Sequence, residues 1–200
     1  MYLLRPPADD DVRRFLADAE ALPLTYPLVG ASRGTTTPPP GYRRNHIRAP
    51  LGHGEATFGR AVAALHRWTM YDMDWVSLVP AVPPVETGRT LAMVVRHFGF
   101  HSVFGCRVVY TYDEDDGAGR RAGFGIGTLA GHLEQGEERF SVEWDRATDR
   151  VEYELFSFTR PGRFLVRLGG PLSRSKQHQF ARQSAAQMQR AAAGGSGAQD

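Results

Sequence analysis

Cysteine is almost absent from this chain: Cys106 is the only one among 200 residues. A single cysteine excludes an internal disulfide framework and any metal site built from several cysteines. Cys106 lies in the segment Gly-Cys-Arg-Val-Val-Tyr, which is typical of a strand, so we expect a buried and unreactive thiol. Stability must then come from a hydrophobic core, and 42% apolar residues in a chain of this length suffice for a sizeable one.

Long hydrophobic runs are absent as well. No segment approaches the roughly 20 consecutive apolar residues that cross a bilayer. No basic segment followed by an apolar one begins at Met1. These patterns predict a cytoplasmic protein without a membrane span.

Positive charge is scattered and comes almost entirely from arginine, since Lys176 is the only lysine. A nucleic-acid-binding surface usually carries a clustered basic stripe, so we expect no nucleic-acid partner. The chain has no nucleophile elbow, P-loop or dinucleotide fingerprint. The run from Gly123 to Gly127 lacks the spacing and the following helix that a phosphate cradle needs. No cofactor is expected.

The most distinctive segment that is present covers residues 122–144: a glycine-spaced strand, a polar turn and an alternating strand. Side chains alternate between the two faces of a strand, which sets Gly123, Gly125 and Gly127 on one face. Glycine at every second position leaves a bare groove, where a packed helix or a ligand can approach closely.

On the strand after the turn, the same alternation places Glu138 on the inward face with Phe140, Val142 and Trp144. One carboxyl group therefore lies beside an apolar face. The residues expected to face water instead are Glu137, Arg139, Ser141 and Glu143.

His132, Glu134, Glu137 and Glu138 form the constellation with the most chemical potential. Glu138 and His132 are the candidate catalytic residues, because desolvation raises the pKa of an inward carboxyl group and suits it to acid or base catalysis. A metal site is not expected, because alternation separates Glu137 from Glu138. The alternative for Glu138 is a buried structural ion pair with an inward arginine, either Arg107 or Arg160.

Several further side chains are candidates for binding a ligand. Arg160 either clamps an anionic group or caps the sheet. The aromatic candidates either line a cavity or fill it. The candidate ligand-binding residues are Trp75, Arg107, Tyr110, Thr128, Glu134, Tyr153 and Arg160.

Periodicity and turn residues predict the remaining elements. Helices are expected over 9–22, 55–72 and 172–193, with an extended Pro-, Thr- and Gly-rich connection over 24–41. Strands are expected over 42–51, 75–79, 90–96, 104–113, 121–128, 137–144 and 151–158. This organisation predicts an N-terminal helix and connection over 1–41, a single domain over 42–193 and a flexible tail over 194–200.

This order of elements resembles the helix-grip architecture of START-like and Bet v 1-like (SRPBCC) domains. The resemblance implies an α+β fold, in which a curved antiparallel sheet of about seven strands grips a long C-terminal helix. The N-terminal helix is an addition to that pattern. Interior space between sheet and helix is where such folds hold ligands.

Several further motifs are spread over most of the chain. They are Leu51-Gly-His-Gly, Ala64-Leu-His-Arg-Trp68, Trp75-Val, Cys106-Arg-Val-Val-Tyr110, Gly127-Thr-Leu-Ala-Gly-His132-Leu-Glu134-Gln-Gly-Glu137-Glu138-Arg-Phe140, Phe156-Ser-Phe-Thr-Arg160-Pro161 and residues 174–180. With these motifs the chain resembles a bacterial and plant family called DUF1990, or UPF0548, to which no reaction is assigned.

Three functions fit these patterns. The first is binding of a small apolar or amphipathic molecule in an internal cavity, with Glu138 and an arginine fixing its polar end. The second is a small-molecule enzyme of cyclase, hydrolase or isomerase type that uses Glu138 or His132. The third is a ligand-free interaction domain, with aromatic side chains filling the cavity. Fold similarity cannot choose among them, because function is carried by the site.

Overall fold

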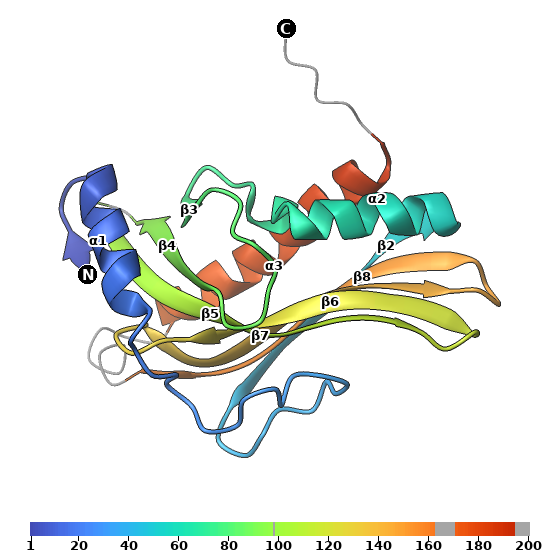
Figure 1. The fold of residues 1–200 in the computed structure, drawn as a ribbon, viewed down its shortest axis with the longest axis horizontal. Helices are drawn as coiled ribbons and strands as arrows, with labels where there is room; N and C mark the ends of the chain where they lie inside the picture. Colours follow the sequence, from blue (N-terminus) through green and yellow to red (C-terminus); the bar gives the residue numbers. More distant parts are fainter. Residues whose placement is uncertain (98, 163–170, 195–200) are drawn as a thin grey trace, which may run out of the picture.

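A single antiparallel sheet organises the molecule (Figure 1). The computed structural model describes residues 1–97, 99–162 and 171–194, with side chains in the last range from residue 176 on. The strand order is β2-β8-β7-β6-β5-β4-β3, and a short β1 pairs with β5. The strands are β1 (Tyr2–Leu3), β2 (Arg43–His53), β3 (Val76–Val79), β4 (Thr90–Arg96), β5 (His101–Asp115), β6 (Gly119–Thr128), β7 (Glu134–Asp145) and β8 (Arg150–Pro161).

Two helices cover one face of this sheet, which we call the inner face. These are α2 (Glu55–His66) and the long C-terminal α3 (Pro171–Ala192), which lie on the same side in Figure 1. The expected α+β helix-grip architecture is confirmed. The end of the expected flexible tail, residues 195–200, lies outside the described residues.

The helix expected over 55–72 is shorter than predicted. It ends at His66, and a separate 3-10 turn, η1 (Thr69–Tyr71), follows. Trp68 separates the two because its backbone is left-handed, with φ 59°. The indole N–H of Trp68 donates to the Pro83 carbonyl at 2.7 Å, which satisfies a buried donor and fixes this break.

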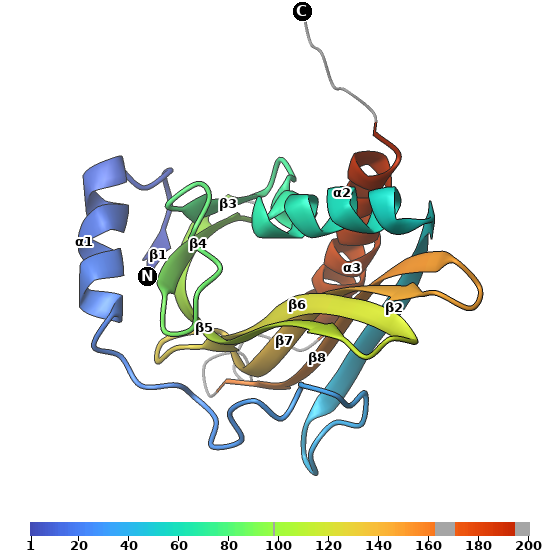
Figure 2. The same ribbon diagram turned by 45° about the vertical axis from the view of Figure 1, so that its right-hand side comes forward.

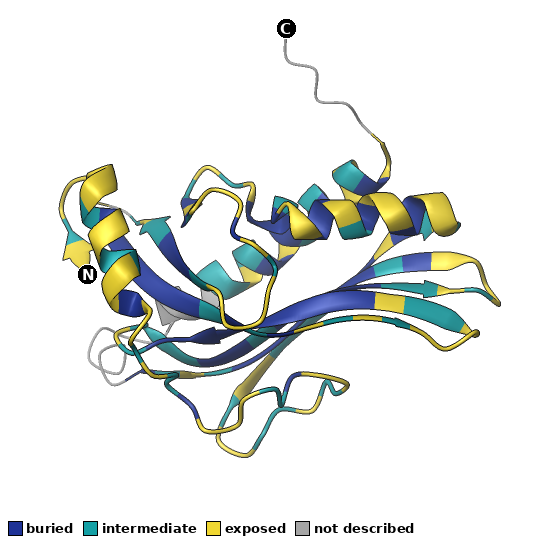
Figure 3. Cartoon of the chain, viewed as in Figure 1, coloured by how far each residue is buried: buried dark blue, intermediate teal, exposed yellow. Residues whose placement is uncertain are grey.

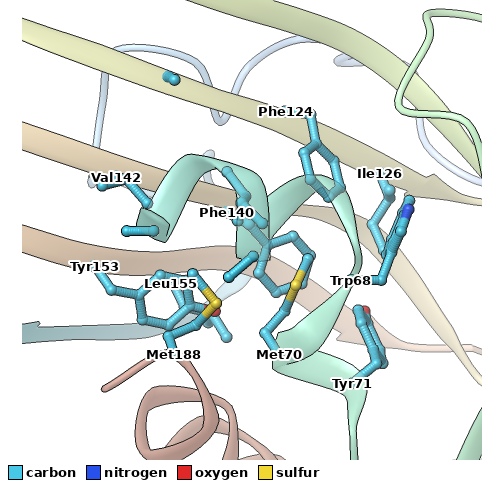
Figure 4. Close-up of a cluster of buried hydrophobic side chains, with 14 of the residues drawn as sticks. Trp68, Met70, Tyr71, Phe124, Ile126, Phe140, Val142, Tyr153, Leu155 and Met188 are labelled. Carbon is cyan, nitrogen blue, oxygen red and sulfur yellow. The ribbon is translucent and has the colours of Figure 1, made fainter. Parts of the chain in front are cut away.

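The main hydrophobic core lies between the inner face and the two helices. Figure 4 shows its side chains pointing toward one another from the sheet, from the segment that includes η1 and from α3. Large buried members are Trp68, Met70, Phe124, Phe140, Tyr153, Leu155 and Met188. Alternation along β6, β7 and β8 supplies the sheet side of this core.

The opposite, outer face is covered too. At one end α1 (Asp9–Ala19) packs through Val12 on Ala92 and Val103. From α1 the chain runs across the outer face before it enters β2 (Figure 2). We call residues 24–42 the strap. Within it, Tyr26 packs against Phe156 and Phe158 in a second small core.

Coverage of both faces corrects one prediction. Glu137, Arg139 and Ser141 were expected to face water, but their exposed fractions are 1%, 5% and 0%. The prediction of alternation is right, and the prediction of water on the outer side is wrong, because the strap occupies that side. Figure 3 shows buried residues along the central strands.

Candidate functional site

Glu138 lies on the inner face of β7, as alternation predicts. In the strand register it stands between Ile126 of β6 and Ser157 of β8. The Tyr71 hydroxyl, from η1, donates to Glu138 Oε2 at 3.3 Å. The break after α2 therefore brings a phenol over the carboxyl group of a distant strand.

The surroundings of Glu138 favour its protonated form. Burial, and next the negative charge of Glu134, raise the pKa of Glu138 to about 8, while the bond from Tyr71 opposes the rise. Within the described part of the chain, the groups that shift this pKa include no cation. Glu138 is thus a mostly neutral carboxylic acid at pH 7, although its side chain keeps an intermediate exposure.

The Tyr71 ring, whose hydroxyl contacts Glu138, belongs to a cluster of aromatic rings on the helix side. The Tyr71 ring lies 5.6 Å from Phe140 and 5.0 Å from Phe180 of α3, measured between centroids. Trp75 makes an edge contact with Phe180 at 6.3 Å. Trp75 and Phe180 are only partly buried, so this part of the interior is less tightly enclosed than the core in Figure 4.

Polar side chains gather beside these rings. Gln177 of α3 donates to both carboxylate oxygens of Glu134 and to Thr159 Oγ1. Trp75 Nε1 donates to Gln183 at 2.7 Å. Lys176 lies over the Trp75 ring, 4.6 Å from its centroid. Glu134 and Trp75, both candidates from the sequence, therefore lie on the α3 side of the sheet with Glu138.

His132, the other candidate catalytic residue, lies in a different environment from Glu138. Its Nδ1 lies 3.0 Å from both the backbone nitrogen and the carbonyl oxygen of Glu134, and its ring packs on Phe104. Burial lowers the pKa of His132 to about 4, so the ring is neutral at pH 7. No hydrogen bond joins it to Glu138 within the described residues.

The two arginines considered as partners of Glu138 lie elsewhere. Arg107 points to the outer face and donates to the carbonyls of Ala19, Glu20 and Leu22 at the end of α1. Arg160 is exposed, lies over the Tyr42 ring and donates to Gln135. A buried ion pair of Glu138 with either residue is therefore wrong.

The remaining sequence candidates are divided between the faces. Tyr153 is on the inner face, where its hydroxyl pairs with Ser184 of α3 at 2.6 Å, and burial raises its pKa well above the usual range. Thr128 bonds the backbone of Gly136 and the hydroxyl of Thr25 in the strap. Tyr110 lies on the outer face, 2.5 Å from Ser32 Oγ.

The glycine groove is not open. A Cβ at Gly125 would lie 2.5 Å from the Tyr110 ring, and one at Gly127 would lie 2.4 Å from the Tyr26 hydroxyl. Gly123 is similarly close to Tyr112. Tyrosine rings from β5 and the strap thus occupy the space that we expected for a helix or a ligand.

Sequence reasoning missed the polar layer under the strap. Glu137 accepts hydrogen bonds from the Tyr26 hydroxyl, from Gly30 N and from both the backbone and the hydroxyl of Ser32. Arg139 donates to Ser32 O and pairs with the buried Glu154. The available signal was a pair of charged residues, Glu137 and Arg139, on the same face of the strand. Such a pair is equally typical of a solvated face.

The inner site also has members that the sequence did not single out, namely Tyr71, Ser157 and Gln177. Each comes from a separate element, so no local motif connects them. Among the described residues, no three His, Cys, Asp or Glu side chains are grouped so that they could hold a metal ion. Across the same residues, no helix has both the length and the apolar character needed to cross a membrane.

Residues 25–187 match a family model described as a domain of unknown function, DUF1990. The chain belongs to this family. A UPF0548 protein of Dictyostelium discoideum is 33% identical, over 96% of this chain and 95% of that protein. A UPF0548 protein of Deinococcus radiodurans is 38% identical, over 96% of this chain and 99% of that protein.

Solved structures of START-like and related proteins are also similar to the chain. A START superfamily protein from Mycobacterium smegmatis has a TM-score of 0.44 at 14% identity, covering 74% of this chain and 95% of that one. Ara h 8.0201 has a TM-score of 0.44 at 12% identity, covering 77% of this chain and 97% of that one.

Proposed function

We propose that this DUF1990 protein binds a small, largely apolar molecule between the inner face of the sheet and α3, with Glu138 at the polar end of the ligand. The observation that carries the proposal is a carboxyl group on the apolar inner face that contacts the Tyr71 hydroxyl and still keeps accessible surface. Burial raises its pKa to about 8, which favours the neutral acid. A buried acid without a cation is costly unless its polar atoms find partners. A ligand that enters beside Tyr71 would supply such a partner.

The borders of the proposed site support a binding role. The side of the proposed site next to α3 is only partly buried, at Trp75, Phe180 and Thr159. The neighbouring core side chains, such as Phe140, are fully buried. Ligand sites combine an apolar lining with a few polar groups that fix orientation, and Glu138, Gln177 and Thr159 are such groups. The ligand would therefore be small and would occupy the α3 side of β7 and β8.

Substituting Ser157 tests this location, because Ser157 lies directly opposite Glu138. We expect the wild-type protein to bind isopropylnaphthalene, a neutral apolar probe, in a fluorescence titration. Ser157→Leu would fill space beside Glu138, so we expect it to weaken binding about tenfold or more. A tenfold loss of affinity corresponds to roughly 1.4 kcal/mol.

Ser77→Leu is the matched control, since Ser77 is an exposed serine on β3. It should leave the affinity unchanged. Melting curves of both variants would test whether each is folded. Equal binding by the wild type and Ser157→Leu, or no binding of apolar probes to the wild type, would contradict the proposal.

A further inference from the structure

The two oxygens of Glu138 differ in their partners. Tyr71 donates to Oε2, so that phenol proton is already used. Oε1 makes no hydrogen bond with any described residue. It is also not fully buried. One oxygen of the carboxyl group is therefore both unpartnered and accessible.

A neutral carboxylic acid has one O–H donor, unlike a carboxylate, which only accepts. With Oε2 occupied as the acceptor for Tyr71, the O–H is left for Oε1. A ligand that covers this donor without accepting its hydrogen bond would leave it with the desolvation cost of the group, so a ligand with an acceptor is favoured. The neighbouring rings of Phe140 and Phe180 carry no hydrogen-bond acceptor, and the Tyr71 hydroxyl is engaged with Oε2 rather than with Oε1.

We propose that Glu138 donates its proton in a hydrogen bond to a carbonyl oxygen of a neutral apolar ligand. This inference rests on the proposed binding function and specifies the chemistry of the ligand's polar end. A ketone or ester oxygen accepts from the acid and brings no charge into an apolar site. Aromatic or alicyclic ketones and esters are the ligand class that fits.

The charges that face Glu138 argue against a carboxylate ligand. Glu134, on the same strand, already contributes negative charge. Among the described residues, the titratable groups from other elements whose charge acts on Glu138 are Tyr71 of η1, Cys106 of β5 and Tyr153 of β8. Burial raises the pKa of each, so all three are neutral at pH 7. On α3, Lys176 lies over Trp75. A ligand carboxylate would add a second anion next to Glu134 in a site of low dielectric constant.

A series of naphthalene derivatives separates the ligand classes, because the members share one ring and differ in one group. Acetylnaphthalene carries a ketone, isopropylnaphthalene is its hydrocarbon match, and naphthoate and naphthylethylammonium carry a charge. At about pH 6.5 we expect the ketone to bind about tenfold more tightly than the hydrocarbon, and naphthoate to bind most weakly.

The preference for the ketone should depend on pH. Above pH 8 Glu138 loses its proton, so the affinity for acetylnaphthalene should fall toward that for isopropylnaphthalene. Glu138→Gln keeps an N–H donor and should retain the preference for the ketone while losing its pH dependence. Glu138→Met removes the donor at similar volume and should abolish the preference. Melting curves verify folding, and the conservative Gln variant keeps the test valid if the Met variant unfolds.

The possible failures are distinguishable. If hydrocarbon and ketone bind equally at every pH, or if Glu138→Met retains the preference, the donor role is overturned while the binding function stands. Tightest binding of the ammonium probe overturns it as well, because the acid would then pair with a cation. If none of the four probes binds the wild type, the binding function itself fails.

Discussion

Gly125 and Gly59 differ in what lies next to them, and this difference predicts opposite effects of alanine. Gly125→Ala would place a Cβ 2.5 Å from the Tyr110 ring, which must move away from Ser32. We expect a loss of about 1–3 kcal/mol in the free energy of unfolding. Gly59 lies in α2, where an added Cβ would have nothing within 4 Å, so Gly59→Ala should stabilise by about 0.5–1 kcal/mol.

Urea denaturation of the two variants measures both effects. A neutral or stabilising Gly125→Ala would mean that Tyr110 does not fill the space over this glycine. At the residue scale, sequence reasoning placed Glu138 correctly, because alternation along a strand is a property of the backbone. It could not identify Tyr71 as its partner, since the left-handed Trp68 that directs η1 has no local sequence signal.

At the scale of elements, one carboxylate of the sheet binds three residues of the strap. Glu137 accepts four hydrogen bonds from Tyr26, Gly30 and Ser32. Glu137→Ala would leave these donors buried without an acceptor. We expect a loss of about 3–5 kcal/mol in the free energy of unfolding and faster amide exchange across residues 24–42.

Glu152→Ala is the control for this prediction. Glu152 also lies on the outer face, but its ion pair with Arg48 is partly exposed and should contribute about 0–1 kcal/mol. Equal effects of the two substitutions on denaturation would show that Glu137 does not hold the strap. The strap's proline- and glycine-rich sequence predicts an extended connection, and the structure shows turns over residues 28–34. The sequence does not predict which surface the strap covers, because its contacts are with distant strands.

At the scale of the whole molecule, Glu138 makes stability depend on pH. Its pKa is about 8 in the fold and close to the ordinary value of 4.5 in the unfolded chain. The folded state therefore binds the proton more tightly, and stability decreases as pH rises from about 4.5 through about 8. His132 acts in the opposite direction, because its pKa is about 4 in the fold and close to 6.5 in the unfolded chain. The stability that neutral His132 contributes is therefore lost as pH falls from about 6.5 through about 4.

Glu138→Gln isolates the first effect because it cannot ionise. Relative to the wild type, we expect the variant's free energy of unfolding to increase by roughly 2–4 kcal/mol between pH 4.5 and pH 8. Denaturation curves at a series of pH values measure this difference. A constant difference across the range would show that Glu138 has an ordinary pKa in the fold.

The sequence by itself determined the order of the elements, the α+β helix-grip architecture and the face on which Glu138 lies. The order of the main elements and the face of Glu138 follow from periodicity and turn residues, which act over short distances along the chain. The helix-grip architecture follows from the resemblance of that order to START-like and Bet v 1-like domains. Only the tertiary structure decided that the outer face is buried and that Arg107 and Arg160 point away from Glu138. Those outcomes depend on contacts between segments about 100 residues apart, such as Tyr26 and Glu137, whose separation is 111 residues.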